Sequence, residues 1–141
     1  MKATLMTPKI VLTVIGILML VHGIAFFFGA SSLAKMGVPE ISEQALQVSV
    51  GAHEIVAIFS VFLGIVLIFS RDIDTRSAKK VLTGTGIGLL ILTAGIIYHM
   101  ITLKEIPEQA PPAPMPIIAA LLTVWTFYVA LVKKEDLEET Q

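Results

Sequence analysis

The chain has 141 residues, of which 55% are hydrophobic and 15% are charged, and its net charge is −1. Its mean hydropathy is +0.87. The sequence contains no cysteine, which excludes disulfides, thiolate metal sites and CxxC redox chemistry. It also lacks a basic cluster with interleaved aromatic residues, so we expect no nucleic-acid partner. The composition is that of an integral membrane protein, whose first partner is the lipid bilayer.

Uninterrupted apolar runs divide the sequence into four parts. Each run has about the 17–25 residues that cross the hydrocarbon core of a bilayer as a helix. The runs cover residues 10–30, 48–70, 81–103 and 115–132. Because backbone polar groups in lipid must be satisfied within the segment, each run is predicted to be an α-helix. The first run is too long for an ordinary signal peptide, so we expect it to be retained. The sequence therefore predicts an all-α, integral membrane four-helix bundle that forms a single domain over residues 1–141.

The distribution of basic residues predicts the orientation of the helices. Lys35 and Lys104 are the only basic residues in the loops after the first and third runs. The other eight of the ten lie at the two ends of the chain or in the loop after the second run: Lys2, Lys9, Arg71, Arg76, Lys79, Lys80, Lys133 and Lys134. By the positive-inside rule, both termini are cytoplasmic, the topology is up-down-up-down, and loops 31–47 and 104–114 lie outside. We expect a multi-pass protein of the cell inner (cytoplasmic) membrane.

The loops contain recognisable helix starts. Ser42 is expected to cap the second helix, with Glu43 in its first turn. Asp74, Thr75 or Ser77 is expected to cap the third helix. The proline-rich segment 107–116 predicts a stiff outer loop that ends with a proline in the first turn of the fourth helix.

Three of the four apolar runs contain a histidine, and the second also contains a carboxylate. At 1.5 Å per residue, His22 lies about 12 Å, His53 and Glu54 about 8–9 Å, and His99 about 6 Å inside the outer ends of their helices. The four side chains are thus expected at a similar depth near the outer surface. Ionisable groups are expensive inside a bilayer, so we identify these four residues as candidates for a ligand or proton site.

Helical periodicity predicts which faces of the helices pack together. One stripe of the second helix consists of Ser49, His53, Ala57, Ser60 and Gly64, and one stripe of the third consists of Gly84, Gly88, Gly95 and His99. Small residues at this spacing allow membrane helices to approach closely, so His53 and His99 are expected to face protein. His22 shares a face with Leu18 and Gly29, whereas Glu54 lies about 100° around the second helix from His53.

The chemistry of such a cluster has several interpretations. Imidazoles and a carboxylate can bind zinc or copper, and two facing histidines can hold haem iron. They can also transfer protons or form hydrogen bonds with a quinone held between helices. The simplest alternative is that each histidine joins neighbouring helices and has only a structural role. No HxxxH or HxxE pattern occurs on one helix, so neither a catalytic residue nor a metal ligand is assigned.

Several short motifs resemble those of a known family. His22-Gly23 lies in the first helix, Gly37-Val38-Pro39 in the loop after it, and Gly51-Ala52-His53-Glu54 at the start of the second helix. Together with Leu63-Gly64, Arg71 and the position of His99, this pattern resembles the DoxX-like group of small four-helix membrane proteins over residues 10–103. The usual lysine after the first-helix glycine is replaced here by Phe26-Phe27-Phe28.

The resemblance implies a bacterial or archaeal inner-membrane protein. Some members of the group are subunits of quinone-linked sulfur oxidoreductases or associate with redox-stress complexes. By position, Glu54 corresponds to the acid of the group's second helix, and His22 and His99 correspond to polar positions often found there. The resemblance thus points to quinone, and the histidines themselves add haem, so the cofactor stays open between the two.

Three classes of function follow from these observations. The first is an accessory or quinone-facing subunit of a membrane redox complex, whose partners are other membrane subunits or a second copy of the chain. The second is a noncatalytic assembly or scaffold protein, and the third is a small transporter element. A standalone enzyme is not expected, because the sequence contains no complete catalytic set.

Overall fold

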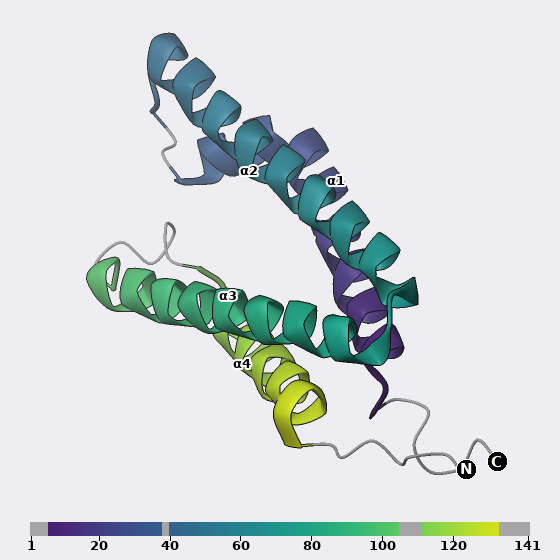
Figure 1. Cartoon of the computed structure of the whole chain (residues 1–141). Helices are drawn as coiled ribbons and strands as arrows, with labels where there is room; N and C mark the ends of the chain where they lie inside the picture. The colour runs from purple at the N-terminus through teal and green to yellow at the C-terminus, as the bar shows by residue number, and fades with distance from the viewer. Residues whose placement is uncertain (1–5, 38–39, 105–110, 133–141) are drawn as a thin grey trace, which may run out of the picture.

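The computed structural model describes residues 6–37, 40–104 and 111–132, and this part of the chain contains helices and no strand (Figure 1). Its helices are α1 (Pro8–Gly37), α2 (Glu43–Phe69), α3 (Thr75–Thr102) and α4 (Pro114–Phe127). A short 3₁₀ turn, η2 (Ser70–Asp72), follows α2, and a π-helical turn, η4 (Tyr128–Val132), continues α4. Four helical segments are long and apolar enough to cross a membrane. The predicted all-α fold with four apolar helices is confirmed.

The helices begin where their capping residues predict. The Ser42 hydroxyl accepts a hydrogen bond from the Ala45 N–H at 3.3 Å, and the Asp74 carboxylate accepts one from the Ser77 N–H at 3.0 Å. The Ser77 side chain, together with its backbone N–H, holds the pKa of Asp74 below its usual value of 3.8. Pro114 occupies the start of α4, where a missing N–H has no cost. Because these two caps precede the apolar runs, α2 and α3 begin several residues before the runs do.

α1 and α2 are in backbone contact along a stripe of small residues. A Cβ atom added to Gly23 would lie 2.6 Å from the Ala57 carbonyl oxygen, and one added to Gly64 would lie 2.7 Å from the Gly16 carbonyl oxygen. Ala57, Ser60 and Gly64 are all buried. Since rising numbers on α1 pair with falling numbers on α2, the two helices form an antiparallel hairpin. The packing stripe predicted on α2 is confirmed.

The second hairpin, α3 with α4, packs on a different face of α3 from the predicted one. The buried face of α3 includes Leu82, Gly86 and Leu89, and a Cβ atom added to Gly86 would lie 3.0 Å from the Phe127 ring. The predicted stripe has open space within 4 Å of its three glycines, and its histidine is exposed: Gly84, Gly88, Gly95 and His99. The prediction for α3 was wrong because α4 packs against the face that contains Gly86, where the lack of a side chain leaves room for the Phe127 ring.

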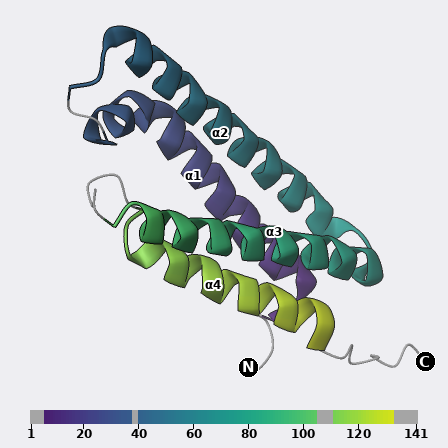
Figure 2. The ribbon, with the colours of Figure 1, turned by 90° about the vertical axis from the view of Figure 1, so that its left-hand side faces the viewer.

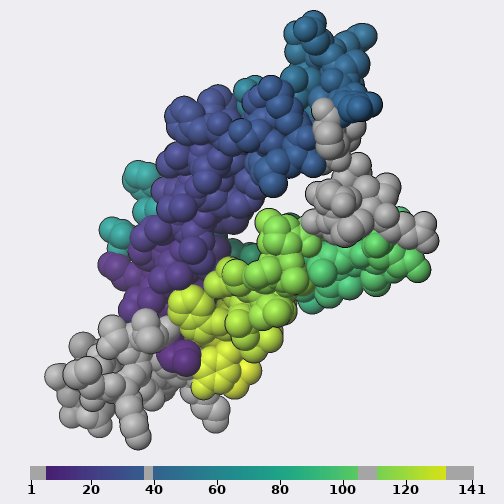
Figure 3. Space-filling view, turned by 180° about the vertical axis from the view of Figure 1, so that it is seen from behind, coloured from purple at the N-terminus to yellow at the C-terminus, as the bar shows by residue number. Residues whose placement is uncertain are grey.

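The two hairpins join at one end and diverge toward the other (Figures 1 and 2). At the packed end, apolar residues from α1, α2, α3 and η4 form the core: Val11, Leu12, Ile15, Leu67, Ala78, Leu82, Leu89, Val129 and Ala130. An ion pair of 2.6 Å between the Lys9 ammonium and the Asp72 carboxylate joins α1 to η2 at this end. α2 has no extensive contact with α3 or α4 in the described residues. A wedge-shaped opening therefore separates the hairpins at the open end, and Figure 3 shows it between α1 and the two helices of the second hairpin.

Candidate functional site: a row of rings on the first hairpin

Three aromatic rings form a row across the α1–α2 pair toward its open end. The ring centroids of His22 and Phe26 are 4.5 Å apart with an interplanar angle of 29°, and those of Phe26 and His53 are 5.8 Å apart at 33°. All three side chains are half-buried. This row of His22, Phe26 and His53, called the ring row below, brings two of the four predicted site residues into one place.

Phe26 was not among the predicted site residues. It was noted only as part of a phenylalanine run that departs from the DoxX-like pattern. Its position four residues after His22 puts the two side chains one turn apart on the same face of a helix. That spacing was the available signal, but only the structure shows that the ring also reaches His53 on α2.

Helical phase shows that the ring row faces the wedge. On α1, Val11, Ile15, His22 and Phe26 follow one another at intervals of four, seven and four residues, which puts them on a single face. At the packed end, Val11 and Ile15 are 0% and 2% exposed in the core shared with the second hairpin. The same face continues to His22 and Phe26, where the second hairpin has moved away. The ring row therefore borders the opening between the hairpins.

Hydrogen bonds determine which nitrogen of each imidazole carries the proton. His53 Nδ1 lies 2.7 Å from the carbonyl oxygen of Ser49, which can only accept, so Nδ1 carries the hydrogen. The hydroxyl of Ser60 donates its one hydrogen to the Val56 carbonyl at 3.0 Å, so it accepts from His22 Nδ1 at 3.3 Å. In the neutral imidazoles, Nε2 of both His22 and His53 is thus an unprotonated acceptor.

Glu54 lies on a different flank of the α1–α2 contact. On α2, Ile68 lies against Gly16 of α1, and Val61 lies against Gly23. A further step of seven residues along each helix places Glu54 at the level of Ala30. The carboxylate is half-buried and forms no hydrogen bond or ion pair with another described residue. The structure thus separates Glu54 from the ring row around α2, although the two are at a similar depth.

His99 lies apart from both histidines of the ring row. It is exposed near the end of α3, and its ring is 5.6 Å from that of Tyr98 at an interplanar angle of 68°. Its helix diverges from α2 toward this end of the molecule (Figure 1). Among the described residues, the structure therefore joins His22 to His53 and leaves His99 as a separate side chain.

The arrangement is a poor fit to a metal or to haem. No group of three histidine or carboxylate side chains in the described part of the chain could hold a metal ion. Haem iron held by two histidines needs both imidazoles on either side of one atom, and the Phe26 ring contacts His22 and His53 at that position. The ring row instead offers two imidazoles that can form hydrogen bonds with a polar organic ligand.

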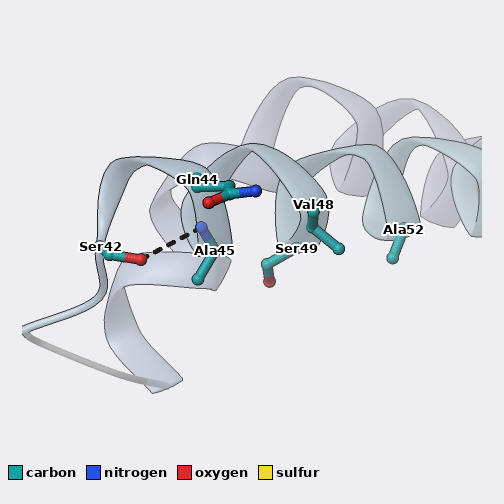
Figure 4. Close-up of a pocket in the computed structure, with 6 residues that line it drawn as sticks. All are labelled: Ser42, Gln44, Ala45, Val48, Ser49 and Ala52. Atoms are coloured by element: carbon teal, nitrogen blue, oxygen red, sulfur yellow. Dashed lines mark hydrogen bonds between the residues drawn. The ribbon is translucent and has the colours of Figure 1, made fainter.

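A shallow surface hollow lies on α2 beyond the ring row. Its lining residues project from one side of the first turns of the helix (Figure 4): Ser42, Gln44, Ala45, Val48, Ser49 and Ala52. Ser49 lines this hollow, and its carbonyl oxygen accepts the hydrogen bond from His53 of the ring row. The hollow thus extends the candidate site toward the end of the hairpin.

No family model, curated protein or solved structure matches the chain. The function must therefore be argued from the residues of the site and the placement of the helices.

Proposed function

We propose that this chain is a multi-pass inner-membrane protein with up-down-up-down topology and both termini in the cytoplasm, related to the DoxX-like group. The antiparallel pairing of α1 with α2 supports this topology, and so does the concentration of basic residues near the packed end. Lys9, Arg71 and Arg76 all belong to this end, where cytoplasmic lipid headgroups would meet them. The open end of the wedge then lies in the outer half of the bilayer.

Within that membrane, the chain serves as an accessory or quinone-facing subunit of a redox complex. The observation that carries this proposal is the ring row, in which two imidazoles with unprotonated Nε2 atoms flank the Phe26 ring. Polar groups inside a membrane are costly unless they have partners, so two imidazole acceptors at membrane depth favour a ligand with polar atoms. An apolar pocket wall with a few orienting polar groups is typical of small-molecule sites.

A scaffold function is the second candidate, and the wedge itself favours it. Many large apolar side chains are exposed in the described part of the chain, including Ile91 at 67% and Leu121 at 65%. Such faces can pack against helices of other membrane subunits or of a second copy. A transporter element is less well supported, because the core at the packed end consists of apolar side chains and would block a polar path.

The test is purification of the tagged full chain from its native membranes, followed by identification of the co-purifying proteins and of the extracted quinones. We expect a redox enzyme to co-purify, and its quinone-dependent activity to fall when His53→Gln replaces the wild type. His99→Gln is the matched control, since it makes the same change in an exposed histidine outside the ring row. Co-purification of membrane proteins without any redox enzyme would favour the scaffold function.

Glu54→Gln separates the two roles of the carboxylate. If Glu54 belongs to the functional site, this variant should insert and fold normally but impair the activity of the complex. If Glu54 only packs between α1 and α2, the variant should change thermal stability alone. Measuring both quantities on the same preparation distinguishes these outcomes.

A further inference from the structure

We infer that the beginning of α3 binds an anionic phospholipid of the cytoplasmic leaflet. Arg76 and Lys80 hold the phosphate of this lipid, and Ile87 and Ile91, farther along the same face of the helix, contact one of its acyl chains. These four residues are called the lipid face below. The inference goes beyond the redox role proposed above and does not depend on it. It rests on the proposed topology only for the choice of leaflet.

The first observation is the difference in charge between the two ends of the molecule. In the described part of the chain, the packed end has five basic and two acidic side chains: Lys9, Arg71, Arg76, Lys79, Lys80, Asp72 and Asp74. The loops at the open end have two of each kind in the described residues: Lys35, Lys104, Glu40 and Glu43. An excess of basic residues next to a membrane attracts anionic lipid headgroups, so the packed end is the end that favours them.

The second observation is that both acidic side chains of the packed end already have partners. The Asp72 carboxylate pairs with the Lys9 ammonium at 2.6 Å and with the Arg71 guanidinium at 3.2 Å. The Asp74 carboxylate accepts the hydrogen bond from the Ser77 N–H that caps α3. Lys9 and Arg71 are therefore neutralised within the chain, and an anion from outside gains less from them.

Arg76 and Lys80 differ from that pair. Both residues are exposed, and neither side chain forms an ion pair or a hydrogen bond with another described residue. They are four residues apart on α3, so their charged groups lie one turn apart on the same face. Two cationic groups at this spacing can both contact one phosphate, whose oxygens accept hydrogen bonds from guanidinium and ammonium groups.

The third observation is the apolar surface that continues from the basic pair. Ile87 and Ile91 follow Lys80 by seven and eleven residues, which puts them within about 20° of it around the helix. Their side chains are 49% and 67% exposed. The helical rise places them about 10 and 16 Å beyond Lys80, a length similar to half of the roughly 30 Å hydrocarbon core. The face therefore matches a phosphate with an acyl chain attached, and not a phosphate alone.

The position of Arg76 also favours an anion at this place. It lies in the first turn of α3, which contains no acidic residue. The partial positive charge of a helix N-terminus disfavours a basic side chain there and favours a negative group. A phosphate bound at Arg76 would offset both positive charges, whereas without it the arginine is unfavourable for the helix.

Native mass spectrometry of the full chain tests the lipid face. The protein is reconstituted in nanodiscs of equal parts phosphatidylglycerol and phosphatidylcholine, and the lipids that remain bound after release from the disc are identified. The wild type should retain phosphatidylglycerol in preference to phosphatidylcholine. Lys80→Gln and Arg76→Gln should each reduce this preference by roughly 5-fold. Lys9→Gln is the matched control, because it removes the same charge from a cation that is already paired, and it should change the preference by less than roughly 2-fold.

Several results would overturn the inference. Equal preference in the wild type and in Lys80→Gln would show that the basic pair does not hold the lipid. An equal loss in Lys9→Gln would show diffuse attraction by the whole packed end. Release of the bound phosphatidylglycerol by an equal concentration of glycerol phosphate would show that the apolar part of the face contributes nothing.

The acidic C-terminal segment is the other candidate for this surface, and the full chain with its four acids changed to amides tests it: Glu135, Asp136, Glu138 and Glu139. This variant should retain the same lipids as the wild type. A preference for phosphatidylglycerol that appears only in the variant would assign the lipid face to the C-terminal segment and refute the inference.

The result separates this inference from the proposed function. Both leaflets of the nanodisc have the same composition, so the lipid preference does not depend on the orientation of the protein. Loss of the preference would refute the lipid face and leave the subunit assignment and the topology as proposed. Reversed cysteine labelling in intact cells would refute the topology and, with it, the choice of leaflet.

Discussion

Replacing Gly23 with alanine should push α1 and α2 apart. The added Cβ would lie 2.6 Å from the Ala57 carbonyl oxygen, whereas ordinary van der Waals contacts begin at 3.4 Å. The backbones must therefore separate locally by about 0.8 Å, the difference between these two distances. Because the obstructing atom belongs to the main chain of α2, no change of rotamer can relieve the contact.

The expected magnitude follows from two opposing effects. Overpacking a close contact costs about 1–3 kcal/mol, whereas replacing a glycine in a helix with alanine gains about 1 kcal/mol. We expect Gly23→Ala to lower the free energy of unfolding by up to about 2 kcal/mol. Gly88→Ala is the matched control, since a Cβ there meets nothing within 4 Å. It should leave the stability unchanged or raise it by up to about 1 kcal/mol.

The assay is unfolding of both variants in the same detergent. Helix content is followed by far-UV circular dichroism, and tertiary packing by the fluorescence of Trp125, the single tryptophan, which packs against the core. Subtracting the two changes in stability removes the helix-propensity effect and leaves the steric cost alone. Equal stability of the two variants would refute the backbone contact between α1 and α2.

Three further predictions concern the core, a helix cap and the topology. Leu82→Ala should lower stability by about 2–5 kcal/mol, because Leu82 is fully buried at the packed end. Ile91→Ala, at a side chain that is 67% exposed, should change it by less than about 0.5 kcal/mol in detergent unfolding. The stabilisation that comes from the lowered pKa of Asp74 is complete above pH 3.8 and is lost as the pH falls through the folded-state pKa. The NMR signals of the first turn of α3 should therefore titrate in this range, and Asp74→Asn should abolish that titration. An impermeant thiol reagent applied to intact cells should label Glu40→Cys and not Thr75→Cys, and the reverse pattern would contradict the proposed topology.

Some features of the molecule follow from local sequence. The four apolar helices could be predicted because a bilayer requires each spanning segment to satisfy its own backbone hydrogen bonds. The caps Ser42 and Asp74 act within a few residues of their own positions, so the sequence was enough to place them. The packing stripe on α2 was also predictable, since its small residues repeat at helical spacing through Gly64.

Other features depend on which helices meet and at what register. Periodicity identified stripes of small residues on both α2 and α3, but only the tertiary structure shows that Gly86 contacts a neighbour and that Gly88 does not. In the same way, similar depth suggested one group of ionisable residues, whereas the structure joins His22 to His53 and leaves His99 apart. A helix face is defined by residues a few positions apart, so sequence alone determines it. Which helix packs against that face depends on the sum of contacts between distant segments. Here those contacts hold the two hairpins together at one end and leave them apart at the other.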